Sequence, residues 1–190
     1  MKLTIHDMIL ISLFTVLTII GGKISLTILT IPFTLQSLVG TLSGILLGAK
    51  RGMLSQALYI ALGLMGLPVF AAGGGIAYVL QPSFGFLIGM LLAAGLVGGL
   101  CDRIDPTRLL LKIRQAVPIN LIGQIIVYLI GVTYLYLLQN LIIGQSLPLS
   151  RAIAIGALPF LIIDSLKSLL AAIIGPRLRR ATRRYLQQPG

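Results

Sequence analysis

An acidic and a basic residue interrupt a long apolar run in Asp164-Ser165-Leu166-Lys167, near the C-terminal end of the sequence. The run extends from Ile153 to Ile174, and these two residues are its charged members. A helix of about 20 residues, rising ~1.5 Å per residue, crosses the ~30 Å hydrocarbon layer of a bilayer. The run therefore predicts a membrane-spanning helix that carries both charges inside the membrane.

Two charged residues inside the membrane are energetically costly. A charged residue at the centre of an inserted helix costs about 2.5 to 3.5 kcal/mol. Residues three apart lie on one face of a helix, so Asp164 and Lys167 can pair with each other or reach into one pocket. Two interpretations stay open at this point: a structural ion pair that fixes the helix to its neighbours, or a binding site within the membrane.

Composition assigns the chain to a class of proteins. Its 190 residues are 57% hydrophobic and 10% charged, whereas about 25% of the residues of a soluble domain are charged. The net charge of +11 comes from short basic clusters between apolar runs, which is typical of membrane topology signals and not of a nucleic-acid-binding surface. A multi-pass protein of the cytoplasmic membrane, surrounded by lipid and without a nucleic-acid partner, is predicted.

The pattern of apolar runs and charges predicts an all-α fold with six transmembrane helices. With both termini in the cytoplasm, twelve of the 15 basic residues fall on the inner side, and Lys23 and Arg151 fall outside. This bias follows the positive-inside rule. We expect a single six-helix substrate-binding domain over residues 1–190. The six runs cover about 5–22, 35–49, 53–70, 84–100, 116–140 and 153–174.

Glycine and polar residues add detail to this topology. The outer segment 71–83, between the third and fourth helices, contains Gly73-Gly74-Gly75 and then Gln81-Pro82. Three consecutive glycines and a proline disfavour a continuous helix, and glycine permits close approach of a ligand to the backbone. Gly40, Gly44 and Gly48 recur every four residues and indicate close helix packing. Asn120 and Gln124, also four apart, indicate interhelical hydrogen bonds.

Several kinds of chemistry lack their residues. The chain has four aspartates, no glutamate and one histidine, His6, so metal clusters, paired-carboxylate hydrolysis and Ser/His/Asp catalysis are not expected. The only Gly-Lys dipeptide, Gly22-Lys23, is followed by isoleucine, so no phosphate-binding loop is present. We expect no enzyme activity and no cofactor. Energy for uphill transport has to come from other subunits or from an ion gradient.

Seven segments spread along nearly the whole chain follow a recognisable order: 31–36, 44–52, 59–70, 73–75, 81–89, 158–160 and 164–167. Together they resemble the BioY family of biotin transporters. The resemblance implies a six-helix substrate-capture component, or S-component, of an energy-coupling factor (ECF) transporter. In that family a transmembrane coupling protein and two cytoplasmic ATPases supply the energy, and biotin binds between the outer loops and the last helices.

The resemblance also implies a set of biotin-binding residues. Asp164 can accept N–H bonds from the ureido ring of biotin, and such charge-assisted bonds are strong. Lys167 can neutralise the valerate carboxylate or donate to the ureido oxygen; both remain open. The other expected binding residues are Gln81, at the ureido edge, Tyr78, Phe84 and Phe86, which cover the apolar ring, and Gly74, Gly75 and Gln36 in the matched segments.

High-affinity biotin capture is the favoured function. The alternative of a different class is a stand-alone ion-coupled carrier that uses Asp164 as a proton or cation relay. A third interpretation is an accessory subunit in which Asp164 and Lys167 only pair with each other. Biotin binding, collapse of uptake with the proton gradient, and the effect of swapping the two charges distinguish the three.

Overall fold

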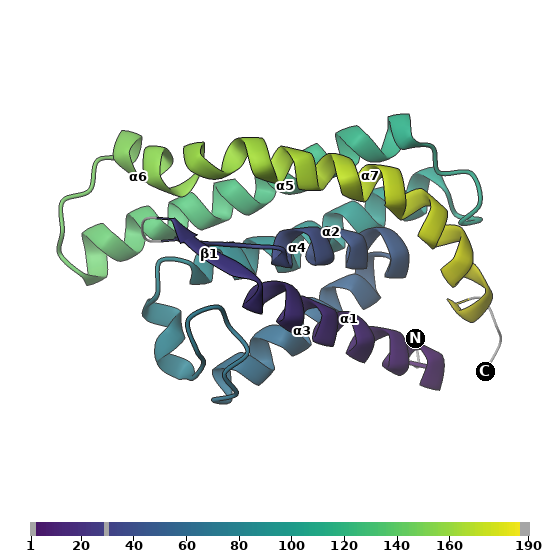
Figure 1. Cartoon of the computed structure of the whole chain (residues 1–190), viewed down its shortest axis with the longest axis horizontal. Coiled ribbons are helices and arrows are strands. Elements are labelled where there is room, and N and C mark those ends of the chain that lie inside the picture. The colour runs from purple at the N-terminus through teal and green to yellow at the C-terminus, as the bar shows by residue number, and fades with distance from the viewer. Residues whose placement is uncertain (1–2, 29–30, 187–190) are drawn as a thin grey trace.

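A computed structural model describes residues 3–28 and 31–186 of the chain, and these form an elongated bundle of helices (Figure 1). α5 and α7 run along one side of the bundle, and α1 and α3 run along the other. In chain order the elements are α1 (Ile5–Lys23), β1 (Ser25–Ile28), β2 (Ile31–Thr34), α2 (Gln36–Leu47), α3 (Ala49–Leu64), the 3-10 helix η1 (Ile76–Leu80), α4 (Phe84–Ile104), α5 (Ile113–Leu137), the π-helical turn η2 (Leu138–Ile142), α6 (Leu149–Gly156) and α7 (Leu158–Leu186).

The prediction of a helical membrane protein is confirmed. Four helical segments are long and apolar enough to cross a bilayer: Ile5–Lys23, Phe84–Ile104, Ile113–Ile142 and Leu158–Thr182. α2 and α3 have 12 and 16 residues. They are about 18 and 24 Å long, which is less than the ~30 Å of the hydrocarbon layer. α2 lies inside the bundle, between the longer helices, whereas α3 lies beside α1 (Figure 1).

Two elements differ from the sequence prediction. An all-α fold was predicted, but β2 pairs antiparallel with β1, so the fold contains a short hairpin besides its helices. The single helix expected over 153–174 is divided at Ala157 into α6 and α7. Pro159 is the second residue of α7, a position where the missing N–H of proline has no partner to lose. The break lets α7 begin at the level of the site described below.

Glycines bring α2 and α4 into close contact, as the four-residue spacing predicted. A Cβ on Gly44 would lie 2.5 Å from the carbonyl oxygen of Ala94, so only glycine fits there. Gly48 adopts φ +85°, a conformation that glycine reaches without strain. It joins α2 directly to α3 and reverses the chain at one end of the bundle. α2 is thereby held in the interior, where Ser37 faces α7.

Two arginines close the end of α2. A helix leaves its last carbonyl oxygens without partners inside the helix. Arg108 donates to the carbonyl oxygens of Leu46 and Leu47, and Arg179, on α7, donates to that of Ile45. Both guanidinium groups are buried. Because cations stabilise helix C-termini, this arrangement satisfies both the hydrogen bonds and the dipole of α2.

Two aspartates, Asp102 and Asp105, form a charge cluster with these arginines. Asp102 pairs with Arg179 at 2.7 Å, and Asp105 lies 3.6 Å from the Nε of the same arginine. Burial raises the pKa of the Asp105 carboxyl, but hydrogen bonds from the backbone of 109–111 and from Thr107 outweigh burial and hold it below its usual range. Asp105 therefore stays ionised and stabilises the folded chain above pH ~4, and this contribution is lost as the pH falls through the folded pKa.

Candidate functional site

The predicted ion pair forms on α7. The Nζ of Lys167 lies 2.7 Å from Oδ1 of Asp164, one turn earlier on the helix. The same ammonium group donates to the backbone oxygen of Thr34 at 2.6 Å and to the hydroxyl of Ser37 at 3.2 Å. Three protein acceptors thus surround the three N–H donors of the lysine. The Lys167 side chain is 8% exposed and that of Asp164 is 19% exposed, so the carboxylate is the more accessible partner.

Hydroxyl groups from two other helices hold the carboxylate. Tyr128, on α5, donates to Oδ2 of Asp164 at 2.7 Å, and Ser37, on α2, donates to Oδ1 at 3.3 Å. Sequence reasoning did not select either residue for the site. A signal for Tyr128 was present, because it continues the four-residue spacing of Asn120 and Gln124 along one face of α5. Ser37 offered no such pattern.

A cavity of about 590 Å³, including its part open to solvent, lies beside the ion pair. Asp164 and Lys167 are its charged residues, and most of the wall is apolar. The residues that line it come from β2, α2, α4, α5, α6, α7 and the loop before α4: Thr34, Gln36, Ser37, Ala71, Tyr78, Ser83, Phe86, Leu87, Met90, Val127, Tyr128, Gly156, Phe160, Asp164 and Lys167.

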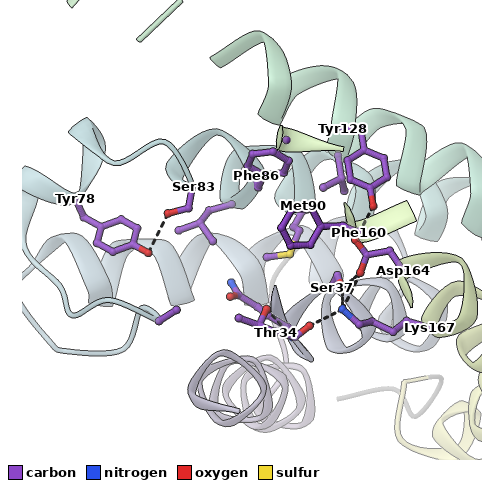
Figure 2. A pocket seen from close by; sticks show the side chains of 15 residues that line it. Thr34, Ser37, Tyr78, Ser83, Phe86, Met90, Tyr128, Phe160, Asp164 and Lys167 are labelled. Carbon is purple, nitrogen blue, oxygen red and sulfur yellow. Dashed lines mark hydrogen bonds and ion pairs between the residues drawn. The ribbon is translucent and has the colours of Figure 1, made fainter. Parts of the chain in front are cut away.

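Polar groups lie at two ends of this cavity (Figure 2). At one end the hydroxyls of Tyr78 and Ser83 are 3.2 Å apart. At the other end is the ion pair with Tyr128. Phe86, Met90 and Phe160 lie between the two ends. The cavity is therefore suited to a ligand with an apolar body and a polar end rich in hydrogen-bonding groups.

Five of the nine residues predicted for the site line this cavity. They are Asp164, Lys167, Tyr78, Phe86 and Gln36. Gln36 begins α2 and is 3% exposed, and its side chain interacts with that of Tyr59 on α3. The structure thus brings together segments more than a hundred residues apart in sequence.

The other four predicted residues are not among those lining the cavity. Phe84 packs edge-on against Tyr134, with ring centroids 5.9 Å apart, and Gln81 is exposed. A Cβ on Gly74 would clash with the carbonyl oxygen of Leu67. Whether any of these residues contacts a ligand stays a prediction.

The glycine-rich segment positions one of the lining residues. Gly75 adopts φ +100° and donates to the carbonyl oxygen of Gly63, at the end of α3, at 2.7 Å. η1 begins at the next residue and places the Tyr78 side chain at the cavity. Tyr78 also packs on Phe70, with centroids 4.3 Å apart. In this structure the glycines shape the wall through Tyr78.

A second cavity of about 410 Å³ adjoins the first. The two cavities share Ser37, Met90, Val127, Tyr128, Asp164 and Lys167 in their walls. Beyond these shared residues, Thr41, Gln124 and Ser168 line the second cavity. The ion pair therefore lies in the wall of both cavities.

Comparisons with known proteins show the family to which the chain belongs. The BioY family model matches residues 1–184. The probable biotin transporter BioY of Lysinibacillus sphaericus is 38% identical over 178 residues, which cover 93% of this chain and 88% of that protein. The biotin transporter BioY of Thermotoga maritima is 36% identical over 169 residues, with 88% and 92% covered.

A solved structure has the same fold. It is the crystal structure of the S-component for biotin from an ECF-type ABC transporter. The TM-score is 0.77 at 29% sequence identity, and the alignment covers 97% of this chain and 92% of that one. The family match, the relatives and the fold lead to one conclusion: the chain belongs to the BioY family.

Proposed function

We propose that this chain captures biotin as the substrate-binding S-component of an ECF-type transporter in the cytoplasmic membrane. The observation that carries the proposal is an apolar cavity whose charged wall is a carboxylate paired with a lysine. Biotin matches this wall, since its bicyclic ring is largely apolar and its ureido group offers two N–H donors and one acceptor. The chain is a transport protein and not an enzyme, and it acts with the transmembrane coupling protein and ATPase subunits of an ECF module, where ATP is hydrolysed.

The contacts suggest different roles for the two charges. The three donors of Lys167 already face protein acceptors, one of which is Asp164. Asp164 has fewer partners at Oδ2, where Tyr128 is the donor. We assign the ureido N–H groups to Asp164, and we assign to Lys167 the task of pairing with that carboxylate and orienting it. Because the pair is neutral overall, the valerate carboxylate of biotin is better placed toward the mouth, where water solvates it.

Biotin binding is expected to raise the melting temperature of the purified protein. A ligand that binds only the folded state stabilises it by about 2.7 kcal/mol at 100 times its Kd. The measurement is a thermal unfolding series in detergent with increasing biotin, together with a titration by calorimetry. A Kd in the nanomolar to micromolar range is expected, and thiamine and riboflavin serve as controls without effect. No binding at millimolar biotin would exclude the proposal.

The stand-alone carrier that uses Asp164 as a relay makes a different prediction. It would drive uptake into liposomes without other subunits, and that uptake would stop when the proton gradient is dissipated. Asp164 already pairs with Lys167 and Tyr128. Proton release from such a carboxylate would have to break both contacts. An S-component instead retains biotin binding but shows no uphill uptake by itself.

The finer topology is part of the proposal. We propose one domain over residues 1–190 with six transmembrane helices and both termini in the cytoplasm, and we count α6 and α7 together as the sixth. The start of α1 and the end of α7 lie at the same end of the bundle (Figure 1). The loop that carries Gly73-Gly74-Gly75 then lies at the outer surface.

Single cysteines test this topology. In a Cys101→Ala background, Gln145→Cys is expected to react with a membrane-impermeant maleimide in intact cells. Leu110→Cys is expected to react only after permeabilisation. Both positions are exposed loop residues at opposite ends of α5. The reverse labelling pattern would contradict cytoplasmic termini.

A further inference from the structure

A row of polar side chains crosses from α5 to α7 on the far side of the ion pair. Asn120, Gln124 and Tyr128 lie four residues apart on α5, on one face of the helix. The amide of Asn120 donates to the backbone oxygen of Ser168 at 3.1 Å, and the Ser168 hydroxyl donates to the amide oxygen of Gln124 at 2.9 Å. The interhelical hydrogen bonds predicted for Asn120 and Gln124 are confirmed.

The hydrogen bonds in this row have one direction. Because the Gln124 oxygen accepts from Ser168, its amide nitrogen is the end left to face a neighbour. Gln124 and Tyr128 lie one turn apart on α5 and both line the second cavity, and their side chains interact. An amide N–H can only donate, so the Tyr128 oxygen is the acceptor in this contact. The Tyr128 proton then points to Oδ2 of Asp164, 2.7 Å away. The Ser168 hydroxyl thus donates to Gln124, and the Tyr128 hydroxyl donates to the carboxylate.

Tyr128 is the member of this row that lines the first cavity. Gln124 and Ser168 line the second cavity only, whereas Tyr128 and Asp164 line both. Ser37 and Lys167 fix Oδ1 of the carboxylate, and Tyr128 fixes Oδ2. A carboxylate has about four lone-pair positions, so an acceptor position remains for a ligand. That position can accept an N–H but offers no proton of its own.

We propose that Tyr128 and Gln124 are positioning residues that hold Asp164 as a hydrogen-bond acceptor and thereby select ligands that present N–H donors; this rests on the proposed function. Neither residue has to touch the ligand. Tyr128 fixes the plane of the carboxylate, and Gln124 fixes the direction in which the Tyr128 hydroxyl donates. A ureido ring offers an N–H donor at both nitrogens. A ring with oxygen in those places would set its lone pairs against those of the carboxylate, and a ring with N-methyl groups would clash with it.

The test compares biotin with an analogue methylated on a ureido nitrogen. The variants are Tyr128→Phe, Gln124→Met and the double variant, each purified as the full chain. Removing a hydrogen bond to a charged group costs about 1.5 to 3 kcal/mol, so Tyr128→Phe is expected to raise the Kd for biotin about 10-fold or more. The Kd for the methylated analogue is expected to change less than about threefold, because its recognition does not use the fixed acceptor to the same extent. The Kd for the methylated analogue divided by the Kd for biotin is therefore expected to be smaller in Tyr128→Phe than in the wild type.

Gln124→Met tests whether Gln124 acts through Tyr128, and it alters no residue that lines the first cavity. Alone it is expected to raise the Kd for biotin by about three- to tenfold. In the Tyr128→Phe background it is expected to have no further effect on the Kd, because two substitutions that break the same series of hydrogen bonds do not have additive effects. Tyr134→Phe is the matched control: it removes a hydroxyl from the same helix, donated to the Val79 backbone outside both cavities. It is expected to leave both Kd values unchanged.

Two results overturn the inference while leaving biotin capture intact. One is a wild-type protein that binds biotin and a Tyr128→Phe variant that keeps the same Kd ratio. The other is an additive effect of the two substitutions, which would mean that each acts through packing. If the wild-type protein does not bind biotin, the proposed function and this inference both fail. If Tyr128→Phe does not fold, Gln124→Met alone decides by the Kd ratio.

Discussion

Replacing Asp164 with asparagine is expected to weaken biotin binding by on the order of 100-fold or more, because charge-assisted hydrogen bonds are worth about 1.5 to 3 kcal/mol each and tenfold corresponds to ~1.4 kcal/mol. The amide has one acceptor oxygen where the carboxylate has two. It also leaves the ammonium of Lys167 without its charged partner. Titration calorimetry on the purified variant measures the loss.

The fold is expected to survive this substitution well enough for the measurement. Lys167 keeps the Thr34 backbone oxygen and the Ser37 hydroxyl as acceptors. Circular dichroism and gel filtration check that the variant is folded and monodisperse. Ser165→Ala is the matched control, since Ser165 is the exposed neighbour of Asp164 on α7. It is expected to bind biotin like the wild type.

The same variant separates the three interpretations of the ion pair. If Asp164→Asn binds biotin with a Kd within about threefold of the wild type, Asp164 is not the ureido acceptor. If it retains binding but loses gradient-driven uptake, the relay carrier is favoured. If it only lowers the melting temperature, and exchanging Asp164 and Lys167 restores it, the pair is structural. Loss of binding with a stable fold supports capture.

Much of the helical framework and the centre of the site could be predicted from sequence. α1 was expected over 5–22 and covers Ile5–Lys23, because a long apolar run has few alternatives to a spanning helix. Asp164 and Lys167 stood out since charges are rare in such runs. Their position at a cavity wall is what a binding site within the membrane requires.

Other features had no local pattern to reveal them. The apolar run continues through Gly156, Ala157 and Leu158, so hydropathy could not locate the break between α6 and α7; Pro159 was a weak sign of a helix start. Ser37 is one hydroxyl residue in an apolar segment, and its role depends on α7 lying beside α2. Such roles arise from tertiary contacts between distant segments, which a single sequence does not specify.

Arg179 shows where the topology rule stopped being informative. All basic residues of the C-terminal segment were interpreted as topology signals, yet Arg179 is completely buried while Arg180 is exposed. The positive-inside rule concerns the side of the membrane and does not say which cation enters the protein. The physical reason for burial is the end of α2, whose last carbonyl oxygens have no partners within the helix. Arg179 and Arg108 supply the missing donors.

Arg179→Met is expected to lower the free energy of unfolding by about 3 to 5 kcal/mol, the usual effect of removing one partner of a buried ion pair. Methionine fills similar space, but it leaves the Ile45 carbonyl without this donor and Asp102 and Asp105 without this cation. Denaturant unfolding in detergent micelles measures the change. Arg180→Met is the control: it removes the same charge from the exposed next residue and should change stability little.

Because the cluster lies away from both cavities, protein that remains folded is expected to bind biotin with a Kd within about threefold of the wild type. Equal stability of the two variants would mean that the guanidinium of Arg179 is solvated and does not close α2.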